Sequence, residues 1–141
     1  MSTVLWANLL EGGAVRTDDS DKAALHRHTD ALDTLGTKLG LGSFAELCDT
    51  TDLQFNMSDD DELPPGVEST NELMATKGAW RDLAPALKLL EALLSHLRQH
   101  RPRFGVFRND LDDVIAELDE ALTFAKTARA PDATFNFSVV M

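Results

Sequence analysis

Two histidines in the stretch SHLRQH, His96 and His100, have the four-residue spacing that lets two imidazoles on one helical face share a metal ion. In many zinc enzymes the first histidine of such a pair is followed directly by an acidic residue. Here positions 97–99 are Leu, Arg and Gln. We therefore expect no metal site at this pair, and we interpret both side chains as cations favoured by the C-terminal end of a helix.

Cys48 and His28 are further candidates for nucleophilic or acid–base chemistry. Cys48 lies four residues after Phe44 on one face of an expected helix, and no basic residue between positions 39 and 76 would lower its pKa. We interpret it as a small buried hydrophobic residue. His28 falls within a stripe of leucines, so a buried, hydrogen-bonded core histidine is favoured over a base in a functional pocket.

An arginine-rich stretch, RQHRPRFGVFR at 98–108, contains no acid. Guanidinium groups interleaved with Phe104 and Phe107 suit phosphate binding or stacking on bases. The alternative, which we favour, is that they neutralise acidic groups of the protein itself or of a second copy. The candidate anion-binding residues are Arg98, Arg101, Arg103 and Arg108.

The opposite imbalance occupies residues 39–76, which we call the acidic segment. It holds nine acids and no Lys or Arg, and so carries −9 of the formal net charge of −11. Its run SDDDE at 58–62 does not fit an EF-hand loop, which needs Gly at its sixth position and Glu at its twelfth, where Leu63 and Ser69 stand. We interpret the segment as a docking surface for something basic. The partner-binding candidates are Asp52, Asp59, Asp60, Asp61, Glu62, Glu68 and Glu72.

Composition excludes several classes of protein. The chain has 141 residues, 43% apolar and 26% charged, which is typical of one globular domain spanning 1–141, with an acidic loop at about 58–68. We find no phosphate-binding glycine loop, Gly-x-Ser-x-Gly or Cys-x-x-Cys pattern, so nothing supports an enzyme or a cofactor. The negative charge argues against direct binding of nucleic acid or anionic membranes. A single cysteine and an N-terminus without a basic secretory signal lead us to expect a cytoplasmic protein.

The elements that position these residues begin with a hairpin. Residues 3–10 and 14–17 read as two short strands joined across Gly12 and Gly13. Apolar residues at spacings of three and four then predict a helix over about 21–39, and Ser43 with Glu46 has the capping-box spacing that starts a short helix.

The second half of the chain alternates between helices and strands. The alternating stretch LQFNM predicts a strand over 53–57, and Ser69 with Glu72 repeats the capping-box spacing. A strong leucine stripe predicts a helix beginning after Asp82, and Asn109 is expected to cap the last helix. The alternating TFNFSVVM predicts a C-terminal strand over 134–141.

The resulting fold class is α+β and mostly helical. We expect four to five helices packed on a small antiparallel sheet, which is formed by the N-terminal hairpin, residues 53–57 and the C-terminal strand. The termini would then lie side by side in that sheet.

The favoured function is an acidic protein-binding module that neutralises or regulates a basic macromolecular partner. Bacterial immunity proteins, which inhibit a toxin inside the cell that makes it, are the most concrete example of such an acidic inhibitor. The analogy rests on charge and size. The alternatives are a homo-oligomeric scaffold protein, a nucleic-acid-mimicking decoy, and a small ligand-binding protein or enzyme that uses His28 and the arginines of 98–108. A decoy would spread its charge over a long face, whereas clustering in one segment favours a compact docking patch.

Overall fold

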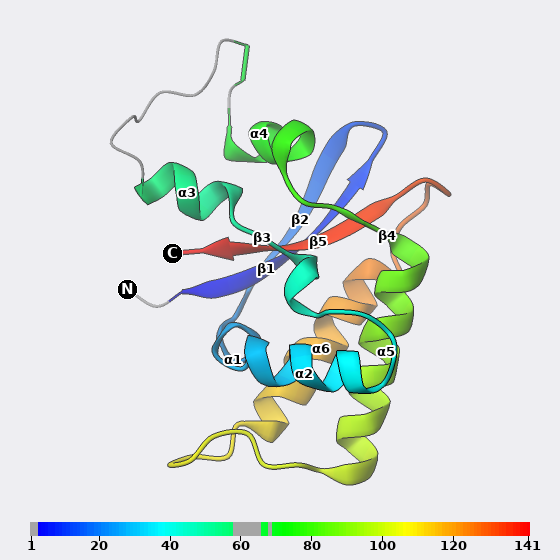
Figure 1. The fold of residues 1–141 in the computed structure, drawn as a ribbon. Helices are drawn as coiled ribbons and strands as arrows, with labels where there is room; N and C mark the ends of the chain where they lie inside the picture. The colour runs from blue at the N-terminus through cyan, green and yellow to red at the C-terminus, as the bar shows by residue number, and fades with distance from the viewer. Residues whose placement is uncertain (1–2, 58–65, 68) are drawn as a thin grey trace.

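The chain forms an α+β fold of three layers, seen in a computed structural model that describes residues 3–57, 66–67 and 69–141 (Figure 1). Helices α1, α2, α5 and α6 lie on one face of a central sheet, and α3 and α4 lie on the other. The elements in chain order are β1 (Val4–Glu11), β2 (Ala14–Lys22), α1 (Ala23–Arg27), α2 (Thr29–Lys38), the 3₁₀ helix η1 (Ala45–Leu47), β3 (Cys48–Asp49), α3 (Thr51–Met57), α4 (Thr70–Lys77), β4 (Arg81–Asp82), α5 (Leu83–His100), α6 (Leu111–Ala125) and β5 (Thr134–Val140).

The centre of the sheet is built from strands near the two ends of the chain. The strand order is β2-β1-β5-β3, with β4 also pairing with β5. β1 runs antiparallel to β5 from Val4 opposite Val140 to Leu10 opposite Thr134. The predicted hairpin and C-terminal strand are therefore confirmed, and the two ends do pair in one sheet.

The apolar face of the sheet forms the main core. Alternate residues of β1 and β5, among them Leu5, Leu9, Phe135 and Phe137, are fully buried against the leucine stripes of α5 and α6. This packing follows from the periodicities of the sequence, because period two along a strand and 3.6 along a helix each gather apolar residues on one face.

The other face of the sheet is polar, although part of it is buried. Thr17, Asn8 and Asn136 stand opposite one another on β2, β1 and β5. The Thr17 hydroxyl donates to Asn8 Oδ1 at 2.6 Å, and Asn8 Nδ2 donates to Asn136 Oδ1 at 2.9 Å. Asn136 Nδ2 then donates to the Ala79 carbonyl at 2.9 Å, which ties the sheet to the chain that follows α4. We call these three side chains the polar row.

The predicted strand at 53–57 is wrong, because these residues belong to helix α3. Asp49 Oδ2 accepts a hydrogen bond from the Thr51 amide at 3.0 Å, and the Gln54 amide bonds to the Thr50 carbonyl at 2.8 Å, which is the helical pattern. The strand that pairs with β5 at this point is instead the two-residue β3, which runs parallel to it.

The predicted helix over 21–39 is replaced by three elements. β2 continues to Lys22, and α1 and α2 then meet at His28, whose φ of −109° and ψ of 23° interrupt the helical backbone. The Lys22 side chain is fully buried, and its Nζ donates to the Ser20 carbonyl at 3.0 Å. This contact fixes the end of β2, and a search for apolar periodicity in the sequence does not detect it. At the far end, Leu39 is exposed rather than part of the apolar stripe.

The remaining helix boundaries agree closely with the sequence. Ser69 caps α4 by accepting a hydrogen bond from the Glu72 amide at 3.2 Å. α5 begins directly after Asp82, as predicted, with Pro85 in its first turn. The cap of α6 lies one residue later than predicted, at Asp110, although Asn109 Oδ1 still accepts from the Leu111 amide.

Candidate functional site

The described part of the acidic segment brings α3 and α4 together. Asp52 in α3 accepts a hydrogen bond from the Thr70 hydroxyl at the start of α4, at 2.8 Å. Glu72 is exposed in the first turn of α4. Asp52 and Glu72 therefore each belong to the first turn of their helix, and Asp52 contacts the start of α4. The other partner-binding candidates, Asp59, Asp60, Asp61, Glu62 and Glu68, fall outside the described residues.

Asp49 anchors this pair of helices and is not a surface acid. Its side chain is buried, and Oδ1 accepts from the Ala79 amide at 2.8 Å and from the Thr51 hydroxyl at 3.1 Å. The contact needs a glycine at position 78, because a Cβ there would lie 2.5 Å from the Met74 carbonyl oxygen. Together with the polar row, Asp49 fixes α3 and α4 on the polar face of the sheet.

The four candidate anion-binding arginines all have partners within the chain. Three form ion pairs with acids of α6: Arg98 with Asp119 at 3.6 Å, Arg101 with Asp112 at 2.7 Å, and Arg108 with Asp113 at 3.0 Å. Arg103 donates to the carbonyls of Gly105 and Val106 at 2.8 and 3.1 Å. An anion bound here would have to compete with these contacts.

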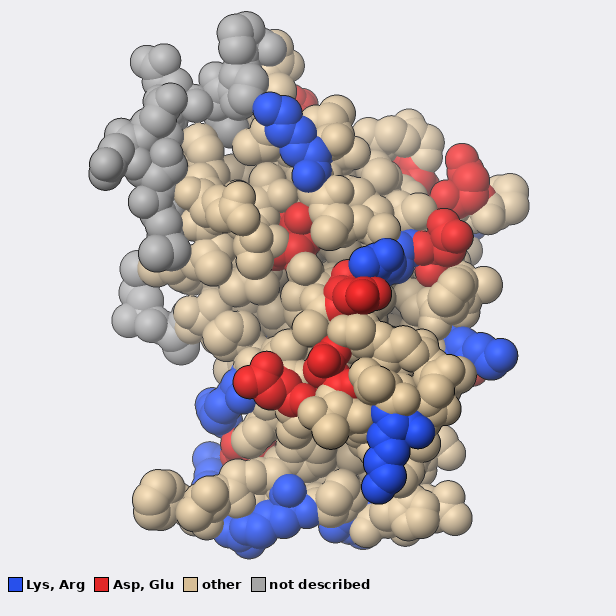
Figure 2. All heavy atoms as spheres, in the orientation of Figure 1, with Lys and Arg blue, Asp and Glu red and all other residues tan. Residues whose placement is uncertain are grey.

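Charge is unevenly distributed on the face of the molecule seen in Figure 2. Figure 2 shows Lys and Arg side chains gathered at the end where α5 and α6 are joined, and Asp and Glu side chains over α2 and the chain that follows it. On that acidic side, Glu46 pairs with Arg81 at 3.3 Å. Hydrogen bonds from the Ser43 hydroxyl and the Ala45 amide hold the pKa of Asp33 below its usual range.

The chain between α5 and α6, residues 101–110, forms a compact structure that we call the Phe107 loop. Asp110 fastens it to the α1–α2 junction, because its Oδ2 lies 2.8 Å from both Arg27 Nη1 and His28 Nε2. The Asp110 amide also donates to the Phe104 carbonyl at 2.7 Å. Hydrogen bonds from His28 and Arg27 hold the pKa of Asp110 below its usual range.

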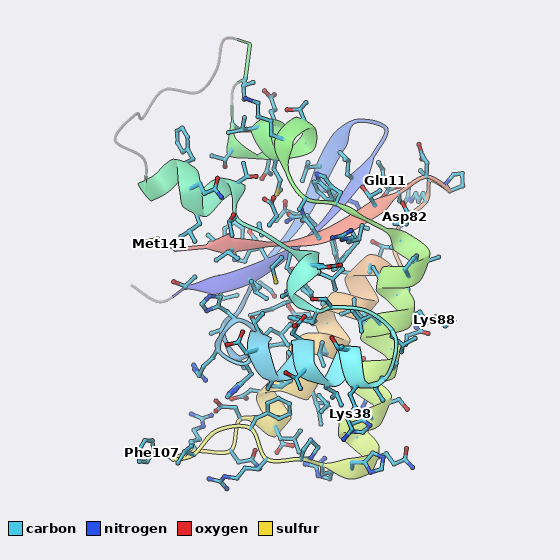
Figure 3. The ribbon with its side chains drawn as sticks, viewed as in Figure 1. Glu11, Lys38, Asp82, Lys88, Phe107 and Met141 are labelled. Carbon is cyan, nitrogen blue, oxygen red and sulfur yellow. The ribbon has the colours of Figure 1, made fainter. Side chains whose placement is uncertain are left out.

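The tip of the Phe107 loop is apolar and points into solvent. Val106 is 85% exposed and Phe107 is fully exposed. Figure 3 shows Phe107 directed away from the rest of the molecule. A hollow of about 350 Å³ lies beneath the tip, lined by His28, Asp110 and residues of the loop.

The other residues that the sequence suggested for chemistry are one cysteine and three histidines. Burial, with the charges of Asp33 and Asp49, raises the pKa of the Cys48 thiol to about 12, which opposes nucleophilic chemistry. His28 is largely buried and its ring contacts Phe104 edge-on at 5.3 Å between centroids. The rings of His96 and His100 lie 4.4 Å apart, and the described residues contain no group of three His, Cys, Asp or Glu side chains placed to hold a metal ion.

Sequence reasoning missed Asp110 and the protruding tip. Asp110 stands in a run of polar residues that resembles any helix start, and its contact with His28 joins positions 82 residues apart. The sequence contained a weak indication of the tip. Phe107 lies two residues after Gly105 in a polar stretch, and it does not belong to an apolar stripe. Gly105 has a φ of 106°, and a Cβ there would lie 2.3 Å from the Arg108 carbonyl oxygen.

Comparison of the chain with family models, curated proteins and solved structures found no match. Within the part of the chain that the structure describes, none of the helices combines the length and the apolar character needed to cross a bilayer.

Proposed function

We propose that the protein is a binding module that neutralises or regulates a basic protein partner through the acidic segment. The observation that carries this proposal is the charge itself, because a stretch of 38 residues holds nine acids without one Lys or Arg. A field of one sign accelerates the encounter with a partner of the opposite sign and excludes partners of the same sign.

The fold supports the proposal by giving the segment a fixed base. Asp49 and the polar row hold α3 and α4 on the sheet, and Asp52 joins one helix to the other. Binding then costs less conformational entropy than it would on a free chain, because the ends of the intervening stretch are already in place. An immunity-type inhibitor of a toxin is the most concrete form of this function, because a compact acidic patch on a small rigid domain can cover the basic site of an enzyme.

The test is a capture experiment with three forms of the protein. In the segment variant, Asp59, Asp60, Asp61 and Glu62 are changed to Asn or Gln. In the matched control, an equal charge is removed from exposed acids elsewhere, namely Asp19, Asp30, Asp119 and Asp132. Each protein carries an N-terminal tag, because β5 is a central strand, and is used to capture binding partners from the native host at low and moderate salt.

We expect one basic protein to be retained by the wild type and the control and lost from the segment variant. With that partner purified, the association rate constant should fall steeply with salt, because screening weakens attraction between opposite charges. Equal retention by all three forms, or by none, would contradict the proposal and leave the acidic segment as a solvated surface.

A further inference from the structure

The first half of β2 has an open backbone edge. β2 lies at one end of the strand order, and among the described strands it pairs only with β1. Glu11 stands opposite Ala14 across the two-residue turn of the hairpin, and such closing pairs exchange hydrogen bonds. Because the bonding direction alternates along a strand, the amides and carbonyls of Val15 and Thr17 then point away from β1. Within the described part of the chain no other group bonds to them.

The second half of β2 is closed by its own side chains. The pairing with β1 becomes irregular after Asp18. The Ser20 amide donates to Asp18 Oδ1 at 3.2 Å, and the Ser20 carbonyl accepts from Lys22 Nζ at 3.0 Å. These contacts occupy backbone groups that an added strand would need. The open edge is therefore limited to about residues 14–18, and it admits only a short strand.

A hollow of about 430 Å³ adjoins this open edge. It is lined by Ala14, Val15 and Arg16 of β2, with Glu11, Thr127 and Arg129. Because successive side chains of a strand alternate between the two faces, a hollow that touches three residues in a row also contacts the strand backbone. Figure 3 shows Glu11 at the end of the sheet, where the hairpin meets the chain that leads into β5. We call this the β2 hollow.

The β2 hollow carries a surplus of positive charge. Glu11 is fully engaged, because its Oε2 accepts from the amides of Arg129 and Ala130 at 3.0 Å and its Oε1 lies 3.2 Å from Arg16 Nη2. The Arg16 guanidinium is also held 5.1 Å from the centre of the Phe124 ring. The guanidinium of Arg129 has no acidic partner among the described residues. Two arginines against one carboxylate leave the hollow suited to one further negative charge.

The sign of the charge changes along the open edge. Asp18 and Asp19 follow at the end away from the hollow, and Asp19 is exposed. A peptide with acidic side chains along its whole length would be repelled there, whereas a peptide with a single carboxylate at one end would not. β2 begins at the hollow, so a strand whose carboxyl terminus lies in the hollow runs antiparallel to β2.

We propose that β2 receives the C-terminal segment of a partner protein as an added antiparallel strand, with the terminal carboxylate bound by Arg129 in the β2 hollow. Backbone hydrogen bonds to Val15 and Thr17 supply the affinity, and the carboxylate fixes the register. The site uses no residue of the acidic segment, so it stands or falls independently of the basic partner.

The test starts from a display library of random heptapeptides whose C-termini are free. The peptides that bind best are synthesised with either a free or an amidated C-terminus. Val15→Pro removes an outward amide, which proline tolerates at the edge of a sheet. Arg129→Gln removes the unpaired cation, and Lys38→Gln is the matched control, because Lys38 is exposed and lies far from Glu11 in Figure 3.

Three measurements separate the parts of the proposal. Titration calorimetry measures the affinity of each peptide for each protein. Amide hydrogen exchange detects new backbone bonds at Val15 and Thr17 in the wild type. Circular dichroism verifies that every variant folds, and if Val15→Pro does not fold, the amidated peptides, Arg129→Gln and the exchange data still decide the outcome.

We expect the selected peptides to bind the wild type and Lys38→Gln equally. Amidation of the peptide and Arg129→Gln should each lower the affinity at least about tenfold, because each removes one side of a charge-assisted contact. The bound peptide should slow exchange of the Val15 and Thr17 amides, and Val15→Pro should abolish binding. A library without a binder, equal binding of free and amidated peptides, or unchanged exchange at Thr17 would each overturn the proposal.

Discussion

At the scale of single residues, buried polar side chains decide how the two faces of the sheet differ. Thr17, Asn8 and Asn136 form a continuous row of hydrogen bonds, whereas the residues on either side of Asn8 in β1 and of Asn136 in β5 enter the apolar core. Such a network is favourable only when its members are satisfied, because a buried group without a partner retains the full cost of desolvation. The alternation in TFNFSVVM predicted the two faces, but a polar residue on a strand is normally solvent-exposed, so burial of the row was not predictable.

Asn136→Ala should lower the free energy of unfolding by about 1–3 kcal/mol, because it removes the side-chain partners of the Ala79 carbonyl and of Asn8 Nδ2. Urea denaturation followed by circular dichroism measures the difference. Thr134→Val is the control on the same strand, because Thr134 Oγ1 is the buried side-chain atom without a hydrogen-bond partner among the described residues. Its stability should stay the same or rise, and a loss equal to that of Asn136→Ala would contradict the role of the row.

Cys48 should resist thiol reagents in the folded protein near neutral pH, because its pKa is raised to about 12 and the reactive thiolate is absent there. Labelling with a chromogenic disulfide at about pH 8 should be slow in buffer and fast in denaturant. The raised pKa also means that the unfolded state loses the proton first, so the fold should lose stability as pH rises from about 9 towards 12. Rapid labelling without denaturant would show that the thiol is accessible.

At the scale of elements, sequence patterns predicted the starts of α4 and α5 but not the division of 21–39 into the end of β2, α1 and α2. The leucine stripe of α5 and the cap of α4 gave their boundaries to within a residue. The run LQFNM was too short to distinguish a strand from a helix, because residues 53, 55 and 57 fit alternation while 53 and 57 also share a helical face. In the structure Asp49 accepts a hydrogen bond from the Thr51 amide at the start of α3, and β3 rather than 53–57 lies beside β5.

In the Phe107 loop, the Asp110 carboxylate joins several elements, and its contribution to stability can be tested. Asp110→Asn removes the charge that pairs with Arg27, His28 and Arg108, so its thermal midpoint at neutral pH should lie below that of the wild type. The pKa of Asp110 is lowered in the fold, so this stabilisation is present above the usual aspartate range and is lost as pH falls below it. The two midpoints should therefore converge as the pH falls below the usual aspartate range, and a difference that does not depend on pH would argue against the charge.

At the scale of the whole molecule, the sequence predicted the α+β class and the pairing of the terminal strands, while charge clustering predicted the candidate surfaces. It could not predict that the arginines of 98–108 pair with acids of α6, because those contacts depend on how α5 and α6 pack. Nor could it predict the hollow of about 210 Å³ that Leu41 and Leu47 form with Leu89 of α5.

Deleting residues 134–141 should prevent folding, because β5 is paired with β1, β3 and β4 and supplies Phe135 and Phe137 to the core. Circular dichroism and urea titration should show no cooperative transition. Deletion of Met141 alone is the control, because it lies outside β5 and is 44% exposed, so that protein should unfold like the wild type. A cooperative transition in the longer deletion would mean that the helices form a core without the central strand.

The pairing of β1 with β5 also has a consequence during synthesis. β1 is translated well before β5, so its inner edge stays without a partner until residues 134–140 have been made. At about 5–20 residues per second, translation of the roughly 130 intervening residues takes on the order of 6–25 s. Throughout that time the nascent hairpin displays an apolar strand with one open edge, which is the feature that chaperones shield and that neighbouring nascent chains can pair with. Yield in the cell should therefore depend on how quickly the ribosome reaches the last strand as well as on the stability of the finished protein.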